Sequence, residues 1–531
     1  RYQKTRFDGM LYFRIAPVSE VGPSMARRSR RTRHRRKTDS VRQLPWQQPV
    51  NNYAPLEVLR QDQVEKIHQA SLDLLENHGL KVLHDGARDL LASAGAEVNH
   101  DTGMVRFDRG MVMERVEMAP AEATLHARNP AKNIRLGGNH LAFSSIGGPA
   151  YCHDLDRGRR RGSFEEVCDY LRLVQSLDII HQEGGGPFEA IELPPETRHL
   201  DLYLAQIRLL DKNWQPIALG RDRARDAINM ARISLGFSEE ELTGKPALFA
   251  IINTNSPLQL DIPMAEGLIE MSSAGQVVCI TPFTLAGAMG PVTLAGTLTQ
   301  QNAEALAGIV LTQVVRPGAP VVYGAFTSNV DMRTGSPSFG TPEYAKAAVA
   351  SGQLARRYGV PWRSSNVTAA NTVDEQSTYE SAMSLWAAIS AHANIIVHAA
   401  GWLEGGLTAS FEKLIVDAEM LQMMAEYLKP IEVDDNTIAL DAIEEAGPGG
   451  HFFGVGHTMS RFEDAFYQPL LSEQRNFETW QEAGSPDTRT RANRIWKKLL
   501  RDYQQPELDP AIDEELTAYV AKRKEGSIQP A

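Results

Sequence analysis

Short apolar runs alternate with longer amphipathic stretches from residue 141 to about residue 428. Short, uninterrupted apolar runs are typical of strands in a parallel sheet, whereas apolar residues that recur every three to four positions are typical of helices. The predicted strands are 141–146, 178–185, 215–220, 247–255, 276–283, 320–326, 361–366 and 394–402. The predicted helices between and after them are 164–176, 195–212, 223–235, 263–273, 294–315, 342–358, 375–391 and 410–427.

Eight strand-helix units in unbroken alternation predict an α/β fold with a parallel sheet, and that number closes a (β/α)8 TIM barrel. An open, doubly wound sheet is the structural alternative. The flanking segments read mainly as helices, with a hairpin-like strand region at 121–136. The expected organisation is a disordered basic tail (1–54), a helical and β extension (55–140), the catalytic barrel (141–430), and a helical extension packed on the barrel (431–531).

The 531-residue chain has a formal net charge of -11, but its charge is unevenly distributed. Residues 1–40 hold 12 Lys and Arg against 3 Asp and Glu, so the remainder is strongly acidic. An acidic body repels phosphates, which argues against a nucleic-acid-binding protein. We interpret the basic run 27–37 as a solvated tail. Met25 is a plausible start, in which case residues 1–24 are an upstream extension.

No Asp, Glu, Lys or Arg occurs between Glu270 and Glu304, which raises the question of a membrane span. Pro282, Gly290 and Pro291 interrupt this stretch, so a buried strand, an uncharged cavity loop and the start of a buried helix explain it better. The three cysteines fit neither a zinc pair nor a disulfide framework. We therefore expect a cytoplasmic protein without a membrane span.

Barrel enzymes place their chemistry at the carboxyl ends of the strands, and aromatic residues recur at those predicted positions. Ring faces hold a quaternary ammonium group, which has no hydrogen to donate in a hydrogen bond. Core packing is the alternative for each ring. The candidate substrate-binding residues are Phe283, Phe326, Asn329, Trp362, Arg363, His398 and Trp402.

Glu183 and Glu404 are the candidate catalytic residues, since each carboxyl group lies among glycines and aromatic residues in a predicted strand-end loop. Either could offset substrate charge, or act as an acid or base after a pKa shift. The alternative is that each carboxylate accepts hydrogen bonds from glycine-loop amides.

His451 and His457 flank the glycine-rich segment GGHFFGVGH. Because no Cys or acidic residue adjoins them at ligand spacing, we expect a lid or partner-docking loop rather than a metal site. The chain contains no GxGxxG, GxxxxGK[ST], GxSxG or DxHxxG motif. These absences argue against dinucleotide, P-loop and α/β-hydrolase sites, and against a corrinoid carried by this chain.

Several segments are similar to those of the trimethylamine methyltransferase family: NTNSPLQLD, TPFTLAGAMGPVTLAGTLTQQNAEALAGIVLTQ, RPGAPVVYGAF, HAAGWLEGGLTASFEK and GPGGHFFGVGHT. The resemblance runs from about residue 55 to about residue 525. It implies a methyltransferase that passes a methyl group to cobalt(I) of a separate corrinoid protein. The family's founding enzymes carry pyrrolysine at the barrel mouth, whereas residues 366–376 here are all standard.

That departure implies a quaternary amine substrate of the glycine betaine type, whose methyl group needs no activating residue. On this resemblance the aromatic residues hold the ammonium, Glu183 or Glu404 balances charge, and Arg363 or backbone amides hold a substrate carboxylate. Association of identical chains is also expected. Two alternatives stay open: another barrel enzyme that uses Glu183 and Glu404 as an acid-base pair, and a non-catalytic protein that binds a quaternary amine.

Overall fold

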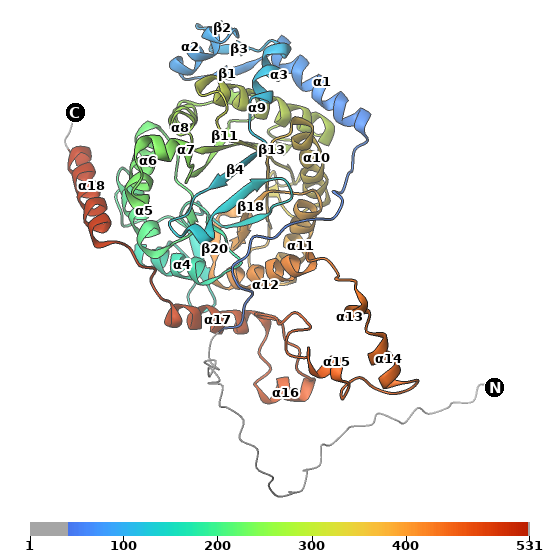
Figure 1. Cartoon of the computed structure of the whole chain (residues 1–531). Coiled ribbons are helices and arrows are strands. Elements are labelled where there is room, and N and C mark those ends of the chain that lie inside the picture. Colours follow the sequence, from blue (N-terminus) through green and yellow to red (C-terminus); the bar gives the residue numbers. More distant parts are fainter. Residues whose placement is uncertain (1–40, 529–531) are drawn as a thin grey trace, which may run out of the picture. The chain divides into compact units, whose positions relative to one another are not determined.

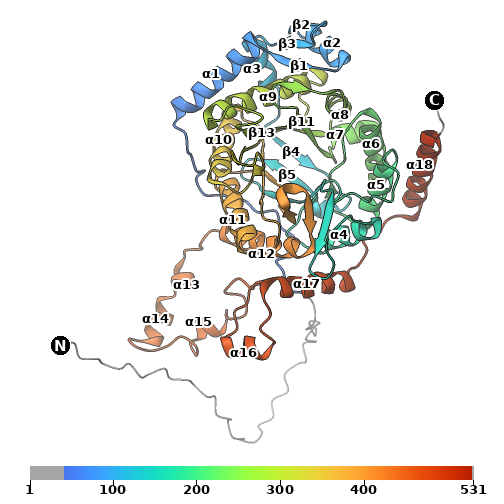
Figure 2. The same ribbon diagram turned by 180° about the vertical axis from the view of Figure 1, so that it is seen from behind.

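The computed structural model describes residues 41–528 of the chain, and parallel strands surrounded by helices form its centre (Figures 1 and 2). All eight predicted strand-helix units are present. The strands are β6 (Ala142–Ser145), β9 (Gln182–Glu183), β10 (Asn213–Trp214), β11 (Phe249–Thr254), β13 (Val277–Ala286), β14 (Val321–Gly324), β17 (Trp362–Ser365) and β18 (Ile395–Ala400). The helices are α4 (Phe164–Ser176), α5 (Arg198–Leu209), α6 (Arg221–Leu235), α8 (Ile262–Ser273), α9 (Leu294–Val315), α10 (Pro342–Tyr358), α11 (Glu375–Ser390) and α12 (Phe411–Tyr427).

Local sequence explains where these helices begin. Ser163 caps α4 and forms a capping box with Glu166, and Thr341 caps α10 with proline in the first turn. A hydroxyl or carboxylate at the cap satisfies an amide that has no partner within the helix, and proline lacks the amide that would be wasted there. These caps account for the starts of α4 and α10, whose predicted boundaries agree with the structure. The predicted boundaries of α9 also agree, although its N-cap residue makes no side-chain hydrogen bond.

The eight strands are parallel and hydrogen-bonded in the order β10, β9, β6, β18, β17, β14, β13, β11. The first strand therefore pairs with the last, with Ala142 opposite Ile395. Within residues 41–528 no ladder joins β10 to β11. The architecture is a mixed α/β fold with a parallel sheet, in which the first of the eight strands, β6, pairs with the last, β18.

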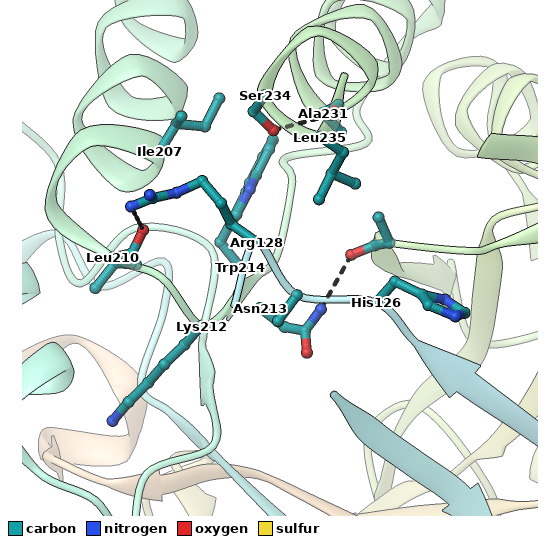
Figure 3. Close-up of a pocket in the computed structure, with 12 residues that line it drawn as sticks. His126, Arg128, Ile207, Leu210, Lys212, Asn213, Trp214, Ala231, Ser234 and Leu235 are labelled. Carbon is teal, nitrogen blue, oxygen red and sulfur yellow. Dashed lines mark hydrogen bonds between the residues drawn. The ribbon is translucent and has the colours of Figure 1, made fainter. Parts of the chain in front are cut away.

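A segment of the N-terminal extension lies where β10 and β11 do not pair (Figure 3). The amide of His126 donates to the carbonyl of Pro246 at 2.8 Å, and the amide of Asn129 donates to that of Asp211 at 3.0 Å. The Asn213 amide group also reaches the Ala247 carbonyl at 3.4 Å. Bonds from residues 126–129 and one side chain thus replace the backbone ladder.

The third strand lies earlier than predicted. It comprises Asn213 and Trp214, whereas the prediction placed it at residues 215–220. The apolar run is correctly located, but Pro216 has no amide to donate to a neighbouring strand. The Gln215 amide still donates to the Glu183 carbonyl at 3.1 Å, but residues 216–219 leave the ladder and line a cavity together with Gln215.

An apolar core fills the space inside the sheet at the amino ends of the strands. Its strand residues are Ala142, Phe249, Val277, Cys279, Val322, Ile395 and Val397. The hairpin of β4 (Glu122–Leu125) and β5 (Ile134–Gly137) adds Leu125, Ile134 and Leu136, all buried. Figures 1 and 2 show this hairpin across the middle of the sheet. The hairpin therefore closes the interior at this end.

The rest of the N-terminal extension packs outside α9. It contains α1 (Gln61–Asn77), α2 (Asp85–Ser93), α3 (Arg109–Glu117) and the strands β1 (Leu80–Val82), β2 (Glu97–Asn99) and β3 (Met104–Arg106), with β12 (Gln259–Leu260) beside β1. Residues 41–54 were expected in a disordered tail, but Gln43 and Trp46 contact Ser176 and His181 of the central unit. The basic run and Met25 lie outside the described residues.

The C-terminal extension is partly packed and partly projecting. Helix α17 (Thr488–Asp502) lies against α12, where the Trp496 indole donates to Glu412 at 2.8 Å, and α18 (Pro510–Ile528) lies against α5 and α6. Four short helices lie between α12 and α17 in the chain and extend away from the sheet (Figures 1 and 2). They are α13 (Asp435–Ile438), α14 (Leu440–Ala446), α15 (Gly456–Met459) and α16 (Phe477–Glu482). No helix in residues 41–528 is long and apolar enough to span a membrane.

One buried histidine predicts how the fold responds to acid. The His181 ring accepts a hydrogen bond from the Phe143 amide through Nδ1 and donates to the Gln47 carbonyl through Nε2, so the ring is neutral. Burial lowers the pKa of His181 to about 4. In the unfolded chain the ring binds a proton below its usual pKa of 6.5, so stability is lost as the pH falls from 6.5 toward 4.

We expect His181 alone to remove up to about 3 kcal/mol of unfolding free energy across that interval. Denaturant unfolding at several pH values measures it. His181→Gln should flatten the acid slope, whereas the matched change of the exposed His451→Gln should leave it unchanged. An unchanged slope in His181→Gln would contradict the assignment.

Candidate active site

A cavity of about 320 Å³ opens at the carboxyl ends of the strands, directly above the apolar interior. Its volume suits a small organic molecule. Strand alternation explains the lining, because Ile251 and Asn253 continue the inward face of β11, and Thr281 and Phe283 that of β13. The other lining residues are Gly147, Gly148, Gly184, Gly185, Gln215, Pro216, Ile217, Ala218, Leu219, Met264, Phe326, Arg363, His398 and Trp402.

Three predicted aromatic residues meet in this cavity. The rings of Phe283 and Phe326 have centroids 5.0 Å apart, and those of Phe326 and Trp402 are 6.2 Å apart. The Trp402 indole donates to the Thr368 carbonyl at 2.9 Å, which fixes its orientation. Phe339 packs edge-on against Phe326 and Trp402 from outside the lining. The three lining rings form a supported aromatic wall.

His398 enters the cavity because β18 is irregular. The pairing of β18 with β6 shifts register between Ile396 and Ala400, and His398 has φ of 57°, in the left-handed region. Such irregularities redirect side chains near active sites. The ring lies 4.6 Å from that of Trp402, and burial with the nearby Arg363 charge lowers the pKa of His398 well below its usual value. His398 therefore lines the cavity as a neutral ring.

Arg363 is the one charged side chain that lines the cavity, and it is 1% exposed. Its Nη1 donates to the Ala325 carbonyl at a long 3.4 Å, and its buried Nε has no partner in residues 41–528. No carboxylate in that range forms an ion pair with it, although its guanidinium lies 5.5 Å from the Phe326 ring centre. Burial lowers the pKa of Arg363. A buried cation with unused donors is costly unless an anion joins it.

Glu183 lies behind the cavity wall rather than in it. Its buried carboxylate accepts hydrogen bonds from the amides of Gly185 at 2.9 Å and Gly186 at 2.7 Å, and from Gln206. Burial raises the pKa of Glu183 to about 7, although these donors oppose the shift. These contacts match the alternative interpretation, in which the carboxylate accepts hydrogen bonds from the amides of a glycine loop. Its carboxylate shapes the glycine loop and does not reach the lining.

The glycine loop that Glu183 holds depends on close backbone approach. A Cβ on Gly147 would lie 1.9 Å from the Gly184 carbonyl oxygen, and a Cβ on Gly184 would lie 2.2 Å from that of Ser145. Both positions therefore require glycine. This contact brings the loops after β6 and β9 together at one side of the cavity.

Glu404 is also absent from the lining. Its carboxylate binds Arg159 at 2.6 and 2.8 Å and accepts from the Thr408 hydroxyl at 2.5 Å. Burial acts to raise the pKa of Glu404, but these partners hold it below its usual value. The pair links β8 (Gly158–Arg160) to the turn between β19 (Trp402–Leu403) and β20 (Thr408–Ser410). Glu183 and Glu404 therefore do not share a reaction space.

Two predicted substrate-binding residues do not line the cavity. Trp362 precedes Arg363 on β17, so alternation turns its ring outward toward Gly352 of α10. Asn329 lies on β15 (Phe326–Val330), and its side-chain oxygen accepts from the hydroxyl of Thr341, the cap of α10. Neither side chain therefore belongs to the lining of this cavity. The sequence located the strand ends, but not which side chains face inward.

His451 and His457 lie on the projecting segment and do not line the cavity. The positions of these two histidines therefore do not support the expected lid over the carboxyl ends of the strands. Within residues 41–528 there is no cluster of three or more His, Cys, Asp or Glu side chains that could hold a metal ion.

Gln215, Met264 and the pair Gly147–Gly148 line the cavity but were not singled out from the sequence. The two glycines directly follow the predicted strand 141–146, so strand-end logic could have found them. Gln215 lies at the start of a predicted strand, where that logic does not look. Met264 lies in the first turn of α8, where no motif marks it.

Comparison with known proteins identifies the family. The family model for trimethylamine methyltransferase (MTTB) matches residues 25–527. The chain belongs to the trimethylamine methyltransferase family. Among its relatives, the glycine betaine methyltransferase of Desulfitobacterium hafniense (strain Y51) is 40% identical over 420 residues, which cover 79% of this chain and 87% of that protein.

Two further comparisons are more distant. Trimethylamine methyltransferase MttB2 of Methanosarcina mazei is 28% identical over 487 residues, covering 89% of this chain and 96% of that protein. The solved monomethylamine methyltransferase of Methanosarcina barkeri has 11% identity and a TM-score of 0.46, covering 84% of this chain and 93% of that one. The family model and the relative at 40% identity together identify the chain as a methyltransferase.

Proposed function

We propose that this methyltransferase removes a methyl group from a quaternary amine that also bears a carboxylate, as glycine betaine does. The methyl acceptor would be cobalt(I) of a corrinoid carried by a separate protein. The observation that carries the substrate class is Arg363, a buried guanidinium without a carboxylate partner in the described chain, beside an aromatic wall.

The two ends of such a substrate match the two parts of the lining. A trimethylammonium group cannot donate a hydrogen bond, so the ring faces of Phe283, Phe326 and Trp402 suit it. A carboxylate can take paired hydrogen bonds from the unused donors of Arg363. An amine with a carboxylate one carbon away is compact enough for a cavity of about 320 Å³.

The reaction needs no acid or base from the protein. The C–N bond breaks and its electron pair stays on nitrogen, which leaves as a neutral tertiary amine, while an electron pair from the acceptor forms the new bond to carbon. No proton moves, in keeping with a lining that contains no carboxylate. We therefore assign no reaction step to Glu183 or Glu404; catalysis rests on positioning and on a dry cavity.

The segment after β17 supports a quaternary rather than a tertiary amine. Residues 366–376 are all standard, and they are engaged in structure: the Thr368 carbonyl accepts from Trp402, and Glu380 accepts from the Ala369 amide at 2.9 Å. A tertiary amine, on this proposal, requires an electrophilic residue for activation. A quaternary amine is already activated.

We also propose the closed fold that holds the reaction and the compartment in which it takes place. The parallel sheet would form a (β/α)8 barrel in residues 141–430, with residues 126–129 completing the wall between β10 and β11. Cobalt(I) requires a reducing environment, so the cytoplasm is the proposed compartment.

Incubation with free cob(I)alamin and candidate amines tests the function. Glycine betaine should change the absorbance to that of methylcobalamin and yield dimethylglycine, whereas trimethylamine should give neither product. Betaine binding in calorimetry without transfer, even with a corrinoid protein, would favour the non-catalytic alternative. Turnover of an unrelated substrate that is lost in both Glu183→Gln and Glu404→Gln would favour the acid-base enzyme.

The aromatic wall yields a separate prediction. Phe283→Leu removes a ring face that lines the cavity, so the affinity for betaine should fall about 5- to 30-fold, as a cation–π contact of roughly 1–2 kcal/mol implies. Calorimetry with tetramethylammonium should show a similar loss. Phe339→Leu is the matched control, because Phe339 supports the wall without lining it. Equal losses in both variants would contradict the role of Phe283.

A further inference from the structure

A second cavity, of about 290 Å³, lies beside the candidate active site. The loop after β9 and the helices α4, α5 and α6 supply most of its lining, whereas none of the three rings of the aromatic wall lines it. The two linings share Gly148, Gly185, Ile217 and Leu219. The two cavities are therefore neighbours with part of a wall in common, and the proposed methyl transfer uses only the first.

Most of the second cavity is apolar, and its wall is tightly packed. Phe188 is 4% exposed, and its ring lies edge-on to that of Tyr170, with centroids 6.1 Å apart. A Cβ on Gly162 would lie 2.3 Å from the Phe188 ring, so only glycine leaves room for the ring there. The apolar lining residues include Phe164, Val167, Phe188, Leu193, Leu202 and Ile217. This wall can bury the apolar body of a small molecule.

The charged part of the lining carries more positive than negative charge. Its titratable residues are Arg198, His199, Arg223 and Glu189, so two guanidinium groups are present with one carboxylate. The buried Nη1 of Arg198 has no hydrogen-bond partner in residues 41–528, although the exposed Glu189 carboxylate lies 3.2 Å from it. Arg223 donates to the Pro195 carbonyl at 3.3 Å and forms no ion pair in the described part of the chain. One positive charge of the lining is thus left without a counter-ion from these residues.

His199 adds a buried nitrogen atom that no other described residue satisfies. The side chain lies in the lining and is almost fully buried, and its Nε2 donates to the Asp226 carboxylate at 2.9 Å. Asp226 also accepts from the Tyr519 hydroxyl and from Arg523, each at 2.7 Å, so this carboxylate is fully engaged behind the ring. The Nδ1 of His199 has no hydrogen-bond partner in residues 41–528. A buried polar atom left in this way is costly, and a polar ligand group would satisfy it.

We propose that the second cavity binds a small organic monocarboxylate, whose carboxylate group lies between Arg198 and Arg223 and whose apolar body packs against Phe188. Guanidinium groups form charge-assisted hydrogen bonds with a carboxylate. One negative charge matches the excess of one positive charge in the lining, whereas a dianion would add an uncompensated charge to a mainly apolar cavity. An inorganic anion would leave the apolar wall uncovered. This ligand is distinct from the amine substrate and binds beside it.

Isothermal titration calorimetry of the full chain with phenylacetate tests the proposal. Phenylacetate should bind with a dissociation constant of about 1 mM or tighter, which is ordinary for a ligand of this size. Phenylethanol has the same ring without the charge, and acetate has the charge without the ring. Each of these two, and inorganic phosphate, should bind at least about 10-fold more weakly, because each loses one of the two kinds of contact.

Substitutions locate the binding site. Arg198→Gln and Arg223→Gln should each weaken phenylacetate binding by about 10-fold, the loss of one charged hydrogen bond. Glu189→Gln should strengthen it, because the competing carboxylate is gone. Arg225→Gln is the matched control: it removes the same charge from α6, but Arg225 is exposed, pairs with Glu270 and does not line the cavity.

Arg363→Met separates the second cavity from the candidate active site, where a carboxylate could also bind. This variant should bind phenylacetate like the wild type. Loss of binding in Arg363→Met with retention in Arg198→Gln and Arg223→Gln would overturn the proposal, because the carboxylate would then occupy the active site. Absence of binding to the wild type, or equal binding of phosphate and phenylacetate, would also overturn it. Unchanged circular dichroism confirms that each variant is folded.

Discussion

Arg363→Met should lower the affinity for glycine betaine by roughly 30- to several-thousand-fold, because a buried hydrogen-bonded charge pair is worth about 2–5 kcal/mol. The change removes the one cation of the lining and keeps an apolar side chain of similar length beside Phe326. Isothermal titration calorimetry measures the loss directly. Methyl transfer from betaine should fall in parallel at low substrate concentration.

Two controls separate carboxylate binding from general damage. Tetramethylammonium has no carboxylate, so its affinity should change by only a few-fold in Arg363→Met. The variant should also have a higher Tm than the wild type, since it no longer buries an unpaired charge. If both ligands lost affinity equally, Arg363 would not be the carboxylate site.

Lys413→Met should lower the free energy of unfolding by about 3–5 kcal/mol, the usual cost of leaving one partner of a buried ion pair alone. Lys413 and Asp417 are both fully buried and form a close pair one helical turn apart on α12, and Lys413 also donates to Ser381 at 2.8 Å. Burial raises the pKa of Asp417, and Lys413 opposes that shift. Without Lys413 the carboxylate must become protonated or remain as an unpaired buried charge.

This pair also supports the cavity. Asp417 accepts a hydrogen bond at 2.8 Å from the amide of Gly401, the residue directly before Trp402. The side-chain amide of Asn366 donates to the Ala399 carbonyl at 2.9 Å. We therefore expect the affinity for betaine to fall together with stability in Lys413→Met. The double variant Lys413→Met/Asp417→Asn should recover most of both losses, because a neutral amide oxygen still accepts from Gly401.

Thermal unfolding measures this effect. The Tm should fall by roughly 3–5 °C, since about 1 kcal/mol corresponds to about 1 °C for a cooperative unit of this size. Lys429 lies just beyond the carboxyl end of α12, so Lys429→Met breaks an exposed pair with Glu426 of that helix and should change Tm by less than about 1 °C. A small effect of Lys413→Met that matched this control would contradict the assignment.

The strand-helix pattern could be predicted from the sequence because each unit is defined locally. A run such as Val277–Ile280 is buried on both faces, and its apolar character does not depend on its neighbours. The pairing between strands could not be predicted in the same way. Residues 126–129, far away in the chain, separate β10 from β11, and no local signal marks that role.

The candidate site was predicted at the level of strand ends but not of side-chain direction. Arg363 and Trp362 are neighbours, and a shift of one residue decides which of them enters the cavity. His398 enters only because β18 is irregular. For Glu183 and Glu404, the glycine-rich surroundings suggested a reactive carboxyl group equally well as one that holds a loop. Only contacts distinguish these two roles.

The hairpin of β4 and β5 has a consequence for the order of events in catalysis. Because Leu125, Ile134 and Leu136 close the interior at the amino ends of the strands, the cavity is a blind-ended chamber. On the proposed function, donor and acceptor would use the same opening. The amine would then enter before the large acceptor covers the mouth, and the demethylated amine would leave only after the acceptor has gone. Steady-state kinetics should therefore show a compulsory order of binding, with the acceptor second in and first out.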